Sequence, residues 1–203
     1  MPYFLLGIGF LLFIFSVLML FVPALSQLDL QIVVWMSQQR SSTLNIISST
    51  LSTVGGMLFV LFLTTIWCLY QVWYKKYQRV VFIALGLVGS IAIVWLLKYL
   101  VSRPRPPEMY HLVESYGASF PSAHSMYAAT LGCLAIYLSQ KHPQHHIIWF
   151  CAVLWLVIMG LSRVYLGVHF PSDVLAGWSI SFIWISLLYL GYAKFSRAKT
   201  NRS

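Results

Sequence analysis

Arginine, histidine and aspartate side chains gather in a short stretch that separates two long apolar runs. The stretch extends from Ser162 to Asp173 and contains Arg163 and His169. Ionisable side chains are costly near hydrocarbon, so a cluster at such a place indicates a functional site. Arginine can hold two phosphate oxygens, histidine can attack phosphorus, and aspartate can hold the imidazole in the reactive tautomer. The residue types therefore suggest phosphoryl transfer, provided that other parts of the chain complete the site.

Two further polar clusters lie upstream, each at the end of an apolar run. They are Lys98–Pro106 and Phe120–Ser125. Basic residues at the end of a membrane span often serve only as interfacial anchors, and Ser122 is well placed as a helix N-cap. A helix N-terminus with free N–H groups and a hydroxyl is also a natural phosphate site. His124 falls in the first turn of that helix, within reach as a proton donor.

The composition indicates an integral membrane protein. Of the 203 residues, 60% are hydrophobic and only 8% are charged, whereas soluble domains have about 25% charged residues. The net charge of +9 fits cytoplasmic loops that meet anionic lipid. Because no basic patch is interleaved with exposed aromatic residues, we expect no nucleic-acid partner. The bilayer itself and a lipid phosphate substrate are the expected partners.

The hydropathy pattern predicts an all-α membrane protein that forms a single domain over residues 1–203. We expect six transmembrane helices, each of about 20 apolar residues, with an amphipathic extracytoplasmic segment at residues 26–53, between the first and second. The predicted spans are Phe4–Val22, Gly55–Tyr74, Val80–Leu100, Ser122–Leu138, Ile147–Tyr165 and Asp173–Tyr192. The first span is too long and too uniformly apolar for a cleaved signal peptide.

Lysine and arginine residues predict the orientation. With six spans, the loops at residues 75–79 and 141–146 share one side with the tail that begins at Lys194. They contain eight of the 13 basic residues, so we predict that this side and both termini are cytoplasmic. All four acidic residues fall on the other side. This topology, which does not depend on the motifs, puts the three polar clusters together at the outer surface.

At these residues the chain resembles the type 2 phosphatidic acid phosphatase superfamily, whose signature is K-x6-R-P, then P-S-G-H, then S-R-x5-H-x3-D. The matching residues are Lys98, Arg105 and Pro106, then Pro121, Ser122 and His124, then Ser162, Arg163, His169 and Asp173. Ala123 stands where the pattern has glycine, which keeps the backbone N–H but adds a methyl group. In size and span number the chain is similar to bacterial membrane lipid phosphatases of the phosphatidylglycerophosphatase B type. That similarity implies the bacterial cytoplasmic membrane.

The resemblance implies a role for each matching residue. His169 would attack phosphorus, oriented by Asp173, and form a phosphohistidine. His124 would protonate the leaving oxygen and then activate water. The residues expected to bind the phosphate are Lys98, Arg105, Ser122, Ala123 and Arg163. We expect no metal and no cofactor, because three cations already face the phosphate and the acidic residues are too scattered for a magnesium site.

The expected reaction is hydrolysis of lipid phosphate headgroups, with the lipid entering sideways from the bilayer. Phosphatidylglycerophosphate (giving phosphatidylglycerol), undecaprenyl diphosphate, phosphatidate and diacylglycerol diphosphate are the candidate substrates. A lipid phosphotransferase with the same site is the enzymatic alternative. An anion or lipid-phosphate transporter is the non-enzymatic one, although it would not need Asp173 behind His169. In the loop over the site, some polar residues either read the headgroup or are only solvated: Arg103, Glu108, His111, Glu114 and Tyr116. The preferred lipid and the oligomeric state stay open.

Overall fold

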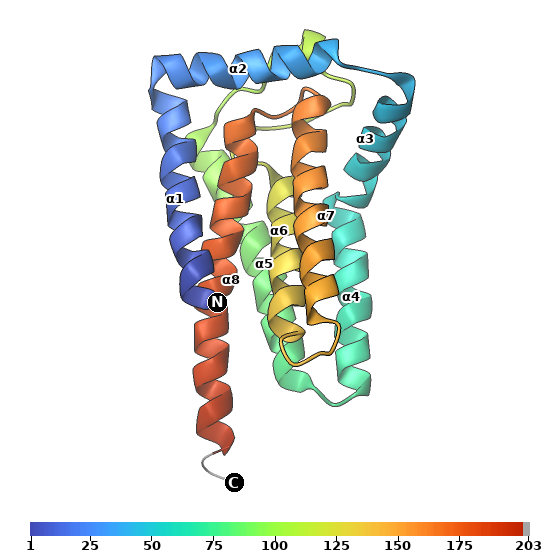
Figure 1. The fold of residues 1–203 in the computed structure, drawn as a ribbon, viewed down its shortest axis with the longest axis vertical. Coiled ribbons are helices and arrows are strands. Elements are labelled where there is room, and N and C mark those ends of the chain that lie inside the picture. Colours follow the sequence, from blue (N-terminus) through green and yellow to red (C-terminus); the bar gives the residue numbers. More distant parts are fainter. Residues whose placement is uncertain (201–203) are drawn as a thin grey trace.

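The chain folds into a bundle of helices with one helix laid across its end (Figure 1). The computed structural model describes the backbone of residues 1–200 and the side chains of residues 1–194. The helices are α1 (Pro2–Phe21), α2 (Pro23–Gln38), α3 (Ser42–Val54), α4 (Met57–Trp73), α5 (Tyr77–Val101), the short 3-10 helix η1 (Glu108–Tyr110), α6 (Ala123–Leu138), α7 (His145–Tyr165) and α8 (Pro171–Thr200). Residues 1–200 contain no strand, so the all-α prediction is confirmed.

Helix α6 forms the centre of the bundle and packs against α5, α7 and α8, while α1 packs along α8. Small hydroxyl side chains join these helices. Ser90 Oγ on α5 lies 2.7 Å from Thr130 Oγ1 on α6, which in turn lies 3.1 Å from Ser181 Oγ on α8. Such hydrogen bonds, together with close packing of small residues, join helices where hydrophobic burial gives little driving force. They fix the positions of the helix ends that carry the polar clusters.

Those helix ends follow from local sequence signals. Ser122 caps α6, and its Oγ accepts a hydrogen bond from Ser125 N. Pro171 is the first residue of α8, a position where proline loses no hydrogen bond. Helix α5 ends after Val101, where Ser102 adopts a left-handed conformation with φ of 47°. The start of α6, the start of α8 and the end of α5 all lie at the end of the bundle that α2 crosses (Figure 1).

The prediction of six transmembrane helices is only partly matched by helix length and hydropathy. Among the described residues, four helices are long and apolar enough to cross a membrane: α1, α5, α7 and α8. Helices α3 and α4 make a fifth if the bent pair is counted as one span. Helix α6 has 16 residues, fewer than the roughly 20 that a span needs. Its N-cap Ser122 and the first-turn residue Ser125 are fully buried.

The predicted amphipathic segment at residues 26–53 contains two helices that run in different directions. Only α2 lies across the end of the bundle, whereas α3 turns downward and continues into α4 (Figure 1). The two are bent by 57° at Gly55 and Gly56, and glycine pairs are a common cause of such breaks. The bend brings the last turn of α3 to the polar clusters.

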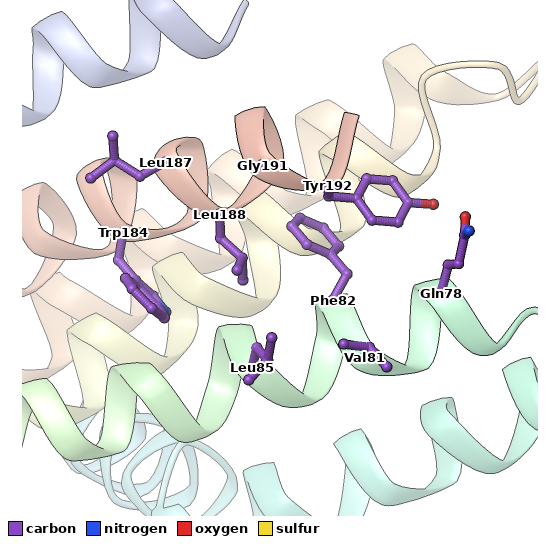
Figure 2. Close-up of a pocket in the computed structure, with 9 residues that line it drawn as sticks. All are labelled: Gln78, Val81, Phe82, Leu85, Trp184, Leu187, Leu188, Gly191 and Tyr192. Carbon is purple, nitrogen blue, oxygen red and sulfur yellow. The ribbon is translucent and has the colours of Figure 1, made fainter. Parts of the chain in front are cut away.

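An apolar groove lies between α5 and α8 at the other end of the bundle (Figure 2). The residues that line it are Gln78, Val81, Phe82, Leu85, Trp184, Leu187, Leu188, Gly191 and Tyr192. None of these carries a charge. Along α5 the groove ends about 20 Å before Lys98, at 1.5 Å per residue. The groove therefore suits hydrocarbon chains, and the charged chemistry lies at the end near α2.

Candidate active site

His169 lies in the short turn between α7 and α8, almost completely buried. Its Nδ1 is 3.3 Å from Asp173 Oδ2, and its Nε2 is 3.3 Å from Arg105 Nη1. A guanidinium can only donate hydrogen bonds, and an ionised carboxylate can only accept them. The two partners therefore favour one tautomer, in which Nδ1 carries the proton and Nε2 presents its lone pair.

The pKa of His169 is lowered well below its ordinary value of 6.5. Burial is the largest cause, and the positive charges of Arg105 and Arg163 add to it, while the hydrogen bond and negative charge of Asp173 act in the opposite direction. A buried imidazole resists protonation because the surrounding protein solvates charge poorly. His169 is therefore neutral at physiological pH, the state that a nucleophile requires.

Asp173 is in the first turn of α8 and reaches back to the turn before it. Its Oδ2 accepts hydrogen bonds from Phe170 N at 2.9 Å and from Ser119 Oγ, besides facing His169. Its Oδ1 pairs with Arg103 Nη1 at 2.6 Å. Several donors on a buried carboxylate favour the ionised form, so Asp173 is suited to orient the imidazole.

The turn that holds His169 depends on glycine. Gly167 has φ of 75°, and a Cβ at this position would collide with the backbone carbonyl of Tyr110. Leu112 N donates to Leu166 O at 3.0 Å, which fastens the loop after η1 to the same turn. The loop therefore packs against the backbone that presents His169.

His124 is in the first turn of α6, and its Nε2 lies 2.9 Å from the carbonyl oxygen of Ser52 on α3. Because a carbonyl only accepts hydrogen bonds, Nε2 carries a proton in this arrangement. Ser52 Oγ accepts a hydrogen bond from Arg163 Nη1 at 2.6 Å. Arg163 Nε is buried and has no hydrogen-bond partner among the described residues. One serine on α3 thus contacts both a candidate proton donor and a candidate phosphate-binding arginine.

Lys98 and Arg105, which are also predicted to bind the phosphate, donate hydrogen bonds to backbone carbonyls. Lys98 Nζ donates to the carbonyl of Ala118 and, at 3.4 Å, to that of Ser119. Arg105 donates to the carbonyls of Tyr116, Gly117 and Val168 at 2.8, 3.0 and 2.8 Å. These two cations therefore fix the loop before α6 as well as carrying charge at the site.

Ser122 and Ala123 form the start of α6, as predicted. The hydroxyl of Ser122 is fully buried and accepts hydrogen bonds from Ser125 N and, at 2.9 Å, from Ser125 Oγ. Ala123 is the first residue of α6 and packs against the apolar core. In this arrangement Ser122 acts through its N-cap, and the methyl group of Ala123 is accommodated by core packing.

Hydrogen bonds join all three polar clusters. Ser122 N donates to the backbone carbonyl of Asp173 at 3.0 Å, so the starts of α6 and α8 are in contact. Gly177 allows this approach, because a Cβ there would lie 2.7 Å from the carbonyl oxygen of Ser122. Arg105 links the first cluster to His169. The site contains four basic side chains and two buried carboxylates: Lys98, Arg103, Arg105 and Arg163, with Asp29 and Asp173. This surplus of positive charge is suited to a phosphate.

Sequence reasoning missed three residues that contact the site: Asp29, Ser52 and Ser119. Asp29 is fully buried and falls four residues after Leu25 and four before Val33, on the inner face of α2. An acidic residue at helical spacing within an apolar face is a signal that the sequence contained. The two serines had no such signal, because only the bend between α3 and α4 and the path of the loop bring them close.

Arg103 also differs from expectation, since it is neither a headgroup reader nor a solvated loop residue. It points inward, between Asp29 and Asp173. The other loop residues, Glu108, His111, Glu114 and Tyr116, line a polar hollow at the surface. Within the described part of the chain, no group of three or more His, Cys, Asp or Glu side chains is arranged to hold a metal ion.

Comparison with known proteins gives consistent matches. The family model of the PAP2 superfamily matches residues 79–197. Phosphatidylglycerophosphatase B of Bacillus subtilis is 31% identical over 154 residues, which cover 73% of this chain and 75% of that protein. Undecaprenyl-diphosphatase of Sulfolobus acidocaldarius is 29% identical over 121 residues, 57% of this chain and 56% of that protein.

A solved structure extends the similarity to the fold. The crystal structure of a transmembrane PAP2 type phosphatidylglycerolphosphate phosphatase from Bacillus subtilis is 28% identical to this chain, with a TM-score of 0.83. The superposition covers 92% of this chain and 96% of that one. The bundle described here is therefore shared almost in full.

Proposed function

Because the chain belongs to the PAP2 superfamily, we propose that it is a membrane lipid phosphatase that works through a phosphohistidine at His169. The observation that carries this proposal is the arrangement of that imidazole. Asp173 accepts from Nδ1, and Arg105 faces Nε2, so the lone pair of a neutral, buried histidine is on the nitrogen beside the arginine. This is the state from which histidine attacks phosphorus.

In the first step, His169 Nε2 attacks phosphorus and the bond from phosphorus to the lipid oxygen breaks. The departing oxygen takes a proton from His124 in its imidazolium form, which the negative charge of the bound phosphate favours, so that the lipid leaves as an alcohol or, from a diphosphate, as a monophosphate, and His124 becomes neutral. The proton stays on His169 Nδ1, where it is hydrogen-bonded to Asp173. The carboxylate stabilises the positive charge on the modified imidazole. The contact of Nε2 with the carbonyl oxygen of Ser52 orients the imidazole of His124 for this role.

In the second step, His124 has lost its proton and acts as a general base. It takes a proton from water while the water oxygen attacks the phosphohistidine. The bond from phosphorus to Nε2 breaks, and its electron pair restores the free imidazole of His169. Inorganic phosphate leaves, and His124 again carries the proton that it donates to the next substrate.

Arg163, Arg105 and Lys98 stabilise the charge on the phosphate oxygens, together with the backbone N–H of Ala123 in the first turn of α6. The unpartnered Nε of Arg163 is a donor that a phosphate oxygen can satisfy. Because these groups are fixed by contacts with backbone carbonyls and Ser52, little reorganisation accompanies the reaction. Such preorganised charge is usually the largest source of rate enhancement.

The substrate class follows from the position of the site at one end of a membrane bundle. Phosphatidylglycerophosphate is the first substrate to test, because both the curated Bacillus subtilis relative and the matched crystal structure from that organism are named for its hydrolysis. Undecaprenyl diphosphate, phosphatidate and diacylglycerol diphosphate are the others. The distribution of basic residues supports a site on the extracytoplasmic face of the bacterial cytoplasmic membrane, with both termini cytoplasmic.

The test is phosphate release by purified protein in detergent, measured on the four lipids. We expect release from at least one lipid, and a fall of about a thousandfold or more in His169→Ala, as is typical when a nucleophile is removed. His142→Ala is the matched control, because this histidine is exposed in the loop between α6 and α7. More than about a tenth of the normal rate in His169→Ala would contradict a nucleophilic role.

A further inference from the structure

A second buried carboxylate lies behind the pair formed by His169 and Asp173. Asp29 on α2 and Asp173 on α8 are both fully buried, and Arg103 lies between them. Arg103 Nη2 is 2.9 Å from Asp29 Oδ2, and Nη1 is 2.6 Å from Asp173 Oδ1. One guanidinium therefore bridges two helices that are distant in sequence. It also prevents two like charges from facing each other without compensation.

Arg103 binds only one of the two carboxylate oxygens of Asp173. It holds Oδ1, which leaves Oδ2 for His169 Nδ1 and for Phe170 N. The guanidinium carbon lies 4.0 Å from the ring centroid of Phe170, so the arginine is fixed by stacking as well as by its ion pairs. The orientation of the carboxylate, and through it that of the imidazole, depends on this contact.

Asp29 also caps the helix that carries Asp173. Its Oδ1 accepts from Ser172 N at 2.9 Å, and its Oδ2 accepts from Ser172 Oγ. Arg103 Nη1 donates to the same hydroxyl at 2.7 Å. The first turn of a helix has free N–H groups that favour a negative charge, and here α2 supplies that charge from outside α8.

We propose that Asp29 and Arg103 are positioning residues of the active site, through which α2 holds Asp173 and hence His169 in the attacking geometry. The inference rests on the proposed function. Neither side chain contacts the phosphate in this scheme, so their loss slows phosphoryl transfer without weakening substrate binding. Residues that orient a catalytic group from behind typically change activity by about 10- to 100-fold.

The test compares Asp29→Asn and Arg103→Gln with the unmodified protein, using the lipid that the latter hydrolyses best. We expect kcat to fall about 10- to 100-fold in each, with KM and the inhibition constant of vanadate within about threefold of normal. Arg103→Lys, which keeps the charge but not the fork, is expected to recover part of the loss. The double variant is expected to lose no more than the poorer single variant, because the two residues act as a unit.

Gln27→Ala is the matched control, since this side chain is exposed on the same helix. If Asp29→Asn does not yield folded protein, Arg103→Lys and Arg103→Gln decide the matter. A kcat within twofold of normal in the folded variants would overturn the inference, and so would a rise in KM that accounts for the whole loss. Failure of the unmodified protein to release phosphate would instead count against the proposed function.

Discussion

At the scale of single residues, the neutral state of His169 depends on its burial. The side chain is almost fully covered, and burial lowers its pKa despite the opposing effect of Asp173. Arg105 and Arg163 act in the same direction as burial. A neighbouring carboxylate alone would raise the pKa of a histidine and protonate it near neutrality. The balance of these contacts keeps the nucleophile free of a proton.

This state predicts a pH effect on stability. Below about pH 6.5 the histidine binds a proton in the unfolded chain but not in the folded protein, so acid destabilises the fold. The loss attributable to His169 begins as pH falls through about 6.5. It amounts to at most about 1.4 kcal/mol per pH unit until the lowered folded-state pKa is reached. Thermal unfolding in detergent from pH 7.5 to 5 measures it.

The comparison is with His169→Asn, which removes the titrating group and keeps similar volume. We expect the unmodified protein to lose stability more steeply on acidification than this variant. Equal slopes for the two proteins would mean that His169 takes up its proton in the folded state as readily as in the unfolded chain, contrary to the neutral nucleophile proposed here.

At the scale of elements, two glycines with positive φ allow a comparison of alanine substitutions inside and outside the turn that carries His169. Gly167 and Gly117 have φ of 75° and 70°, but only Gly167 is crowded, since a Cβ at Gly117 would meet nothing within 4 Å. An alanine in this conformation costs about 1–2 kcal/mol, and crowding adds about 1–3 kcal/mol. We therefore expect Gly167→Ala to lower the melting temperature more than Gly117→Ala does.

Activity provides the second measurement for the same pair. Gly167→Ala must move the carbonyl of Tyr110 or the turn that carries His169, so we expect a loss of kcat that is larger than the loss in Gly117→Ala. Equal effects on melting and on rate would show that the packing between this turn and the loop after η1 does not position the nucleophile.

Contacts within one turn of the chain were predictable from the sequence, whereas contacts between distant helices were not. The pairing of His169 with Asp173 and the cap at Ser122 were predictable, because they depend on residues within one turn of helix. The contacts of Asp29 and Ser52 were not, because they depend on where α2 crosses the bundle and on the bend between α3 and α4. Hydropathy assigned both segments to the membrane surface, since it reports polarity along the chain and carries no information on direction.

At the scale of the whole molecule, the fold brings the ends of α5 and α7 to the starts of α6 and α8. Family motifs predicted that these residue types act together, and the loop charges predicted that they share one end. The predicted segment Ser122–Leu138 agrees with the observed helix Ala123–Leu138. The central position of α6 was not predictable from hydropathy, because a helix buried inside a bundle can be as apolar as one that crosses the membrane. The result is a central helix whose N-terminus points at the site.

The whole account depends on a covalent intermediate at His169, so the most direct measurement is to trap it. Protein mixed with a lipid labelled with ³²P in its headgroup phosphate is quenched in alkali within the first turnover, and the label is located by peptide mapping. We predict alkali-stable, acid-labile label on the peptide that contains His169, and none in His169→Asn. Turnover without label on His169, or label on another residue, would contradict the account.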